Sequence, residues 1–173
     1  DVSLVGSEMC IRDSYDAAQE FNGRVIAPNT IRTIEGGLLS YGSDFGREHN
    51  PYTIGFGRLV DVDQETNFIG KQALKKIKKD GVKEKLIGLE IEGDPLPKAP
   101  ENFWPVNCDG KKIGRLSRAY FSPRVKKNIG LAILDIEFCE EGTVVLLESP
   151  YGDIASKVVS LPWFNADKNT YLD

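Results

Sequence analysis

Hydrophobic and polar residues alternate along the second half of the chain. Ile87, Leu89 and Ile91 are separated by glycine or glutamate, the period-two pattern of a half-buried strand. Further short apolar runs follow after turn residues, at 113–120, 129–134, 143–148 and 154–161. Recurrent short strands separated by turns predict an antiparallel β-barrel or a sandwich.

The first half of the chain shows helical spacing instead. Ile31, Ile34 and Leu38 stand at i, i+3 and i+7, so they share one face of a helix expected over Pro28–Gly37. Glu35 lies four residues after Ile31 and three before Leu38, on that same face. A buried carboxylate costs free energy unless it is hydrogen-bonded. The spacing therefore predicts a partner for Glu35, in the fold or in a ligand.

Other segments carry weaker patterns. Tyr15–Phe21 predicts the end of a longer helix, and Tyr52–Val60, rich in aromatic and branched residues, predicts a strand. Phe68–Asp80 predicts a helix that ends at Gly81. Its lysines are expected to form a solvated face: Lys71, Lys75, Lys76, Lys78 and Lys79.

Composition excludes several classes of protein. The 173 residues carry a net charge of −4 and no dominant basic surface, so we expect no nucleic-acid partner. No apolar run reaches about 18 residues, so no membrane span is expected. The three cysteines are far apart and lack C-x-x-C spacing, which favours a cytoplasmic location over a disulfide framework or a zinc site.

Two interpretations of Glu35 remain open from the residues alone. The side chain can lie at the edge of the apolar stripe and reach water where the helix ends. Alternatively it is a recognition carboxylate, because one Glu accepts paired hydrogen bonds from a ring N–H and its adjacent exocyclic amine, the edge that a pterin or guanine presents. Tyr41 would then offer an aromatic face or a hydroxyl, and the nearby glycines would allow close approach.

The segment RTIEGGLLSYGSD resembles the R-x-E-x-G…YG-x-D signature of the glycine cleavage T-protein family, the folate-dependent aminomethyltransferases. Within that family it looks most like the branch that contains dimethylsulfoniopropionate demethylase. The resemblance continues, in the family's order, through NPYTIGFGRLV, FIGKQAL, KLIGLEIEGDPLP, IGRLSRAYFSPRVKKNIGLAIL and VVSLPWF. It covers roughly Tyr15 to Phe164 and corresponds to the C-terminal half of the family.

The resemblance implies one-carbon transfer to tetrahydrofolate. Glu35 matches the pterin-binding glutamate, and Tyr41 and Asp44 match the YG-x-D motif. Arg118, Tyr120 and the SPRVKKN turn at 122–128 match the barrel motif that faces the folate tail in relatives. Each residue also has a structural alternative; Asp44, for example, is a common turn-forming residue.

The sequence departs from the family pattern at two places. Lys83-Glu84-Lys85 stands where T-proteins usually carry an arginine pair, and Pro95-Leu96-Pro97 lacks an arginine that usually follows. Lysine cannot grip a carboxylate bidentately, so both changes favour a donor other than the lipoyl-bound aminomethyl group. The resemblance also implies that the family's catalytic aspartate lies in the N-terminal half, outside this chain. We therefore assign no catalytic residue and expect the isolated chain to be inactive.

The first functional prediction is a fragment of a tetrahydrofolate-dependent methyltransferase, demethylase-like, which takes a methyl group from a small donor. The main alternative is the aminomethyltransferase of the glycine cleavage system, which acts on an aminomethyl donor with a lipoyl carrier protein. Two further alternatives are a non-catalytic folate-binding relative and a barrel that serves only as an interaction module.

The expected fold class is α+β, with a C-terminal antiparallel β-barrel domain preceded by the helical and strand remnant of a truncated folate-binding domain. Residues 1–14 share no pattern with the rest and resemble translated adaptor sequence; the alternative is a short strand at Ser3–Val5. The remaining boundaries are a folate-binding part at 15–67, a linker helix at 68–81, the barrel at 82–165 and a polar tail at 166–173.

Overall fold

The helices α1 to α3 and the short helix η1 precede the strands in the computed structural model, which describes residues 2–25 and 29–164. The helices are α1 (Val2–Gln19), α2 (Thr30–Glu35), η1 (Gly57–Leu59), α3 (Lys71–Asp80) and η2 (Ile136–Phe138). The strands are β1 (Glu84–Ile91), β2 (Trp104–Cys108), β3 (Lys111–Ser122), β4 (Lys127–Asp135), β5 (Val144–Ser149) and β6 (Gly152–Val159). Asp1, Pro28 and the expected tail 166–173 lie outside the described residues.

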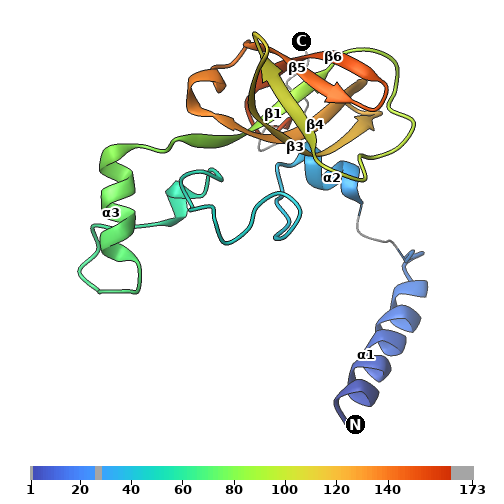
Figure 1. The fold of residues 1–173 in the computed structure, drawn as a ribbon. Coiled ribbons are helices and arrows are strands. Elements are labelled where there is room, and N and C mark those ends of the chain that lie inside the picture. Colours follow the sequence, from blue (N-terminus) through green and yellow to red (C-terminus); the bar gives the residue numbers. More distant parts are fainter. Residues whose placement is uncertain (1, 26–28, 165–173) are drawn as a thin grey trace.

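The strands close into an antiparallel barrel in the order β1-β4-β3-β2-β5-β6, with β6 paired back to β1 (Figure 1). The predicted α+β class with an antiparallel barrel is confirmed, and closure excludes the sandwich alternative. A closed ring leaves no strand edge unpaired, which removes a site for aggregation.

Strand β4 shows how the barrel is both filled and covered. Ala132 and Leu134 belong to the cluster that fills the barrel, together with Leu89 of β1. Ile129, Leu131 and Ile133 belong to a second cluster, which packs on Ile34 of α2 and on Trp163. Successive residues of a strand point to opposite faces, so a strand with both faces covered is apolar throughout. The second cluster holds α2 against the barrel.

Strand β2 was not predicted. Its five residues, WPVNC, include a proline, which cannot donate a ladder hydrogen bond. Trp104 and Val106 are nevertheless buried, and Val106 pairs with Leu147 of β5. Interior packing against neighbouring strands outweighs the weak local signal.

The strand predicted at Tyr52–Val60 is wrong. The segment forms turns and the short helix η1. Asn50 accepts hydrogen bonds from the backbone N–H groups of Tyr52 and Thr53, and Gly55 has a φ of 79°. These are turn features, and they override the aromatic and branched composition. The Thr53 carbonyl accepts a hydrogen bond from the N–H of Leu86, which joins this loop to β1.

The lysine-rich helix starts later than predicted, at Lys71, and ends at Gly81 as predicted. Lys71 is buried, which corrects its assignment to a solvated face. Its ammonium donates to the carbonyl oxygens of Gln64 and Thr66, at 3.1 Å for Thr66. The other lysines of α3 are exposed.

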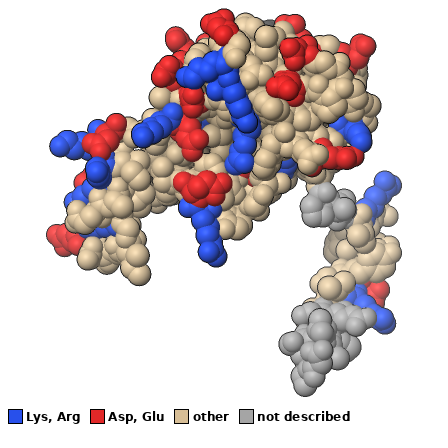
Figure 2. Space-filling model, in the orientation of Figure 1, with Lys and Arg blue, Asp and Glu red and all other residues tan. Residues whose placement is uncertain are grey.

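Helix α1 replaces the strand considered at Ser3–Val5, and the helical prediction at Tyr15–Phe21 holds as far as Gln19. Side chains 10–17 are exposed. In the described part of the chain, no helix has the length and hydropathy that crossing a membrane would require. The barrel face seen in Figure 2 carries Lys and Arg interspersed with Asp and Glu, rather than one continuous basic surface.

Candidate functional site

Helix α2 presents Glu35 to the barrel. Its first turn is capped by the Asn29 carboxamide oxygen, which accepts from the N–H groups of Ile31 and Arg32 at 2.9 and 3.3 Å. At the other end, Leu38 N–H donates to the Thr33 carbonyl. The intervening Gly37 has a φ of 63°, the left-handed position that ends many helices.

The early end of α2 changes the predicted apolar face. The helix stops at Glu35, two residues before the expected Gly37. Leu38 is therefore past the helix and 61% exposed, so its place on the buried stripe is wrong. Ile34 is fully buried, and Glu35 beside it is only 1% exposed. Of the two interpretations of Glu35, the structure contradicts the one in which it reaches water.

The two oxygens of the Glu35 carboxylate have different surroundings. Oε1 accepts a hydrogen bond of 2.5 Å from the Ser122 hydroxyl at the end of β3. Oε2 is buried and accepts no hydrogen bond within the described residues. Arg124 Nη1 lies 3.8 Å from Oε2, close enough for charge compensation but too far for a hydrogen bond. The carboxylate thus keeps acceptor capacity for a donor that the described residues do not supply.

Asp44 and Arg118 form a fork-to-fork pair. Arg118 Nε donates to Oδ1 at 2.8 Å, and Nη2 donates to Oδ2 at 2.5 Å. Asp44 is completely buried and also accepts from Ser117 Oγ at 2.8 Å and Ser40 N–H at 2.7 Å. A bidentate arginine of this kind fixes geometry as well as supplying charge. The pair fastens the loop that carries Asp44 to strand β3.

Arg118 also reaches the α2 side of this junction. Nη1 donates to Thr33 Oγ1 at 3.0 Å, and Nη2 donates to the Leu38 carbonyl at 2.9 Å. The guanidinium therefore bridges β3, α2 and the turn after α2. Its predicted contact with a folate tail is not tested by this geometry and stays a prediction.

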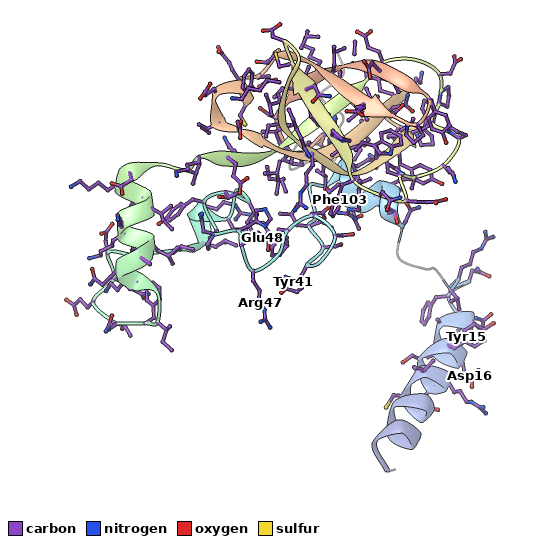
Figure 3. All side chains as sticks on the ribbon, viewed as in Figure 1. Tyr15, Asp16, Tyr41, Arg47, Glu48 and Phe103 are labelled. Atoms are coloured by element: carbon purple, nitrogen blue, oxygen red, sulfur yellow. The ribbon has the colours of Figure 1, made fainter. Side chains whose placement is uncertain are left out.

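The two predicted tyrosines lie in different settings. Tyr41 is 63% exposed, packs edge-to-face on Phe45 with ring centroids 5.7 Å apart, and points away from the barrel (Figure 3). Tyr120 is half-buried on β3 and packs against the cluster that holds α2. The structure thus gathers Glu35, Asp44 and Arg118 at one junction, while the ring of Tyr41 faces solvent.

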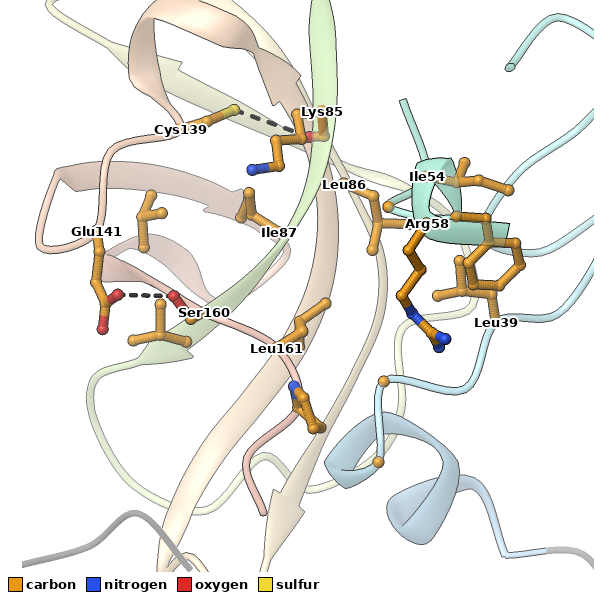
Figure 4. Close-up of a pocket in the computed structure, with 17 residues that line it drawn as sticks. Leu39, Ile54, Arg58, Lys85, Leu86, Ile87, Cys139, Glu141, Ser160 and Leu161 are labelled. Atoms are coloured by element: carbon orange, nitrogen blue, oxygen red, sulfur yellow. Dashed lines mark hydrogen bonds between the residues drawn. The ribbon is translucent and has the colours of Figure 1, made fainter. Parts of the chain in front are cut away.

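A cavity of about 390 Å³ opens beside the end of α2 (Figure 4). Gly36 and Gly37 form part of its wall, and the Glu35 side chain does not line it. Arg58 extends into the space in Figure 4, and Lys85 and Glu141 lie on another wall. The lining thus combines charged groups with apolar side chains such as Leu39 and Ile54.

Cys139 lines the same cavity and is half-buried. Burial raises the pKa of its thiol above the ordinary value, while the Lys85 ammonium acts in the opposite direction. A raised pKa lowers the thiolate fraction and hence the reactivity near neutral pH. Within residues 2–25 and 29–164 there is no cluster of three or more potential metal ligands.

Sequence reasoning did not predict which residues of the site pair with one another. Ser122 lies 87 residues from Glu35 along the sequence, and Arg118 lies 74 residues from Asp44. Ser122 and Arg124 fall in the SPRVKKN turn, which the family resemblance matches to the barrel motif, but the resemblance did not show that they contact Glu35.

Comparison with known proteins agrees with the fold. Residues 84–165 match the glycine cleavage T-protein C-terminal barrel domain. An aminomethyltransferase of Caldanaerobacter subterraneus is 41% identical over 119 residues, which cover 69% of this chain and 30% of the relative. A dimethylsulfoniopropionate demethylase of Ruegeria pomeroyi is 33% identical over 138 residues, which cover 80% of this chain and 37% of the relative.

A solved structure shows the same fold. The glycine cleavage system aminomethyltransferase T of Bartonella henselae superposes with a TM-score of 0.68 at 21% identity, over 79% of this chain and 37% of that one. The chain spans about a third of the length of these relatives. This chain therefore belongs to the glycine cleavage T-protein family and carries its C-terminal barrel domain.

Proposed function

We propose that this chain is part of a tetrahydrofolate-dependent one-carbon transferase that moves a methyl group from a small donor to tetrahydrofolate. The observation that carries the proposal is the Glu35 carboxylate, buried beside apolar side chains with Oε2 open to a further donor. A pterin presents a ring N–H beside an exocyclic amine, and such a pair suits one carboxylate. Demethylation and aminomethyl transfer, the activities named for the relatives, are both one-carbon transfers.

In this proposal the charged pair at the junction positions Glu35. Asp44 and Arg118 satisfy each other, and Arg118 also bonds Thr33 of α2. The pair therefore fixes the end of α2 from which Glu35 projects. Holding a bound reactant in the right position contributes much of the rate enhancement of an enzyme. Tyr41 supplies an exposed aromatic face for the ligand or for a neighbouring surface.

Binding of tetrahydrofolate to the purified 173-residue protein tests the proposal. Isothermal titration calorimetry should show saturable binding, and Glu35→Gln should weaken it by about 10- to 100-fold, the loss expected for a hydrogen bond to a charged group. Glu48→Gln is the control, because that carboxylate is 64% exposed. Absence of binding to the unmodified protein, or equal binding by Glu35→Gln, would contradict the proposal.

The aminomethyltransferase alternative is favoured by one observation: the relative with 41% identity has that activity. Its partner would be a lipoyl carrier protein. Product analysis of the full-length enzyme separates the two, because a demethylase yields methyl-tetrahydrofolate and an aminomethyltransferase yields methylene-tetrahydrofolate and ammonia. In either case we expect no turnover by this chain alone, since the family resemblance assigns the catalytic aspartate to the other half.

The proposal includes a cytoplasmic location and no nucleic-acid or membrane partner. Cys10, Cys108 and Cys139 are all free thiols, which suits a reducing compartment. The mixed charges over the barrel face in Figure 2 give nucleic acid no broad basic surface there.

A further inference from the structure

Arg124 lies beside Oε2 of Glu35, the carboxylate oxygen that accepts no hydrogen bond within the described residues. Its Nη1 is 3.8 Å from Oε2, and its guanidinium stacks over the ring of Phe164 with 4.0 Å between the guanidinium carbon and the ring centroid. The Arg124 side chain is 36% exposed, whereas that of Glu35 is 1% exposed. Arg124 is thus a partly solvated group in contact range of a buried carboxylate.

The turn that carries Arg124 is fastened to the same carboxylate. Ser122 Oγ donates to Glu35 Oε1 at 2.5 Å and accepts from Val125 N–H at 3.0 Å. Lys126 N–H closes the turn on the Ser122 carbonyl at 2.7 Å. With the backbone held at these points, the Arg124 side chain can move away from Oε2 without breaking the turn.

We propose that Arg124 is a gate over the Glu35 site, with the stack over the Phe164 ring as one of the contacts that hold it closed. This inference rests on the proposed function, because it concerns the same carboxylate. Oε1 is engaged by Ser122, so paired N–H donors of a ligand need Oε2 as well. In this proposal a ligand reaches Oε2 from the Arg124 side, and the guanidinium leaves its position beside Oε2 and over the Phe164 ring to admit it.

The gate can be tested without any ligand by carboxyl labelling. The protein is treated with a water-soluble carbodiimide and glycine ethyl ester, and modification of Glu35 is followed by peptide mass spectrometry. We expect faster labelling of Glu35 in Arg124→Gln, in Arg124→Lys and in Phe164→Leu than in the unmodified protein. Lysine keeps the charge but lacks the planar stacking surface, so agreement between the Gln and Lys variants separates a gate from a charge effect.

Arg115 provides a matched control. It stacks over Phe103 at 4.3 Å and lies 3.8 Å from an oxygen of Glu48, so it makes the same two kinds of contact away from Glu35. Arg115→Gln should leave the labelling of Glu35 unchanged. Unchanged labelling in the Arg124 variants, acceleration in Arg124→Gln alone, or equal acceleration in Arg115→Gln would each overturn the gate.

Folate binding gives the second arm of the test. If the open gate makes up about a tenth of the population, Arg124→Lys should bind tetrahydrofolate about tenfold faster and more tightly than the unmodified protein. Faster labelling without any folate binding would support the gate and refute the proposed function. Folate binding with the same association rate in the unmodified protein and in the Arg124 variants would support the function and refute the gate.

Discussion

Replacing Arg118 with alanine would leave the Asp44 carboxylate buried without its main counter-charge. Removing one partner of a buried ion pair costs about 3–5 kcal/mol. Ser117 Oγ and Ser40 N–H would still donate to Asp44, so we expect the lower end of that range, about 3 kcal/mol. The hydrogen bonds of Arg118 to Thr33 and Leu38 would be lost as well.

The loss should be local to the segment that Arg118 holds. The ladder hydrogen bonds between β1 and β4 do not involve this arginine, whereas its side chain bridges α2 and the turn through Asp44. Native-state hydrogen exchange resolves the two regions. A loss of about 3 kcal/mol lowers the protection of the Leu38 and Asp44 amides by about 150-fold.

Two variants calibrate this prediction. Arg115→Ala removes an arginine that lies 3.8 Å from the exposed carboxylate of Glu48. The loss of unfolding free energy should therefore be only about 0–1 kcal/mol. Adding Asp44→Asn to Arg118→Ala should recover part of the loss, because the buried charge is then gone. Unchanged protection of Leu38 and Asp44 in Arg118→Ala, or an equal loss in β4, would refute the reasoning.

Three further changes have defined outcomes. Gly88→Ala would place a Cβ 2.9 Å from the Trp163 ring, so urea unfolding should show a loss of about 1–3 kcal/mol unless that ring moves. Gly37→Ala leaves enough space for the new Cβ but forces alanine to a φ of 63°, so the free energy of unfolding should fall by about 1 kcal/mol. A gain in stability would contradict this. Cys139 should react with iodoacetamide far more slowly than exposed Cys10 at pH 8. Because burial raises its pKa, stability should fall as the pH rises past the ordinary thiol pKa, and alkaline melts of Cys139→Ser should lack that component.

The barrel could be predicted because its signal is local. Alternation at Ile87, Leu89 and Ile91 reports one buried face, and the turns between strands are marked by glycine and proline. The predicted half-burial of β1 was incomplete, because Leu86 and Gly88 on its other face are also covered. That cover comes from α2 and Trp163, which lie far away in the sequence.

The candidate site could be predicted only in part. Helical spacing placed Glu35 on the apolar face of the helix but left open whether its carboxylate reaches water. It also could not show that Ser122 takes one of its oxygens. Lys71 shows the same limit. Its charge led us to expect an exposed side chain, but its ammonium donates to carbonyl oxygens of the preceding loop. Long-range pairs of this kind leave no periodic trace in a single sequence.

The central claim is that Glu35 recognises an amine edge, and a double-mutant cycle against the ligand tests it most directly. Affinities of the unmodified protein and of Glu35→Gln are measured for tetrahydrofolate and for an analogue that lacks the exocyclic amine. We predict that removal of the amine weakens binding to the unmodified protein by about tenfold or more and has little effect in Glu35→Gln. An equal loss in both proteins would show that the amine binds elsewhere, and the claim would be wrong.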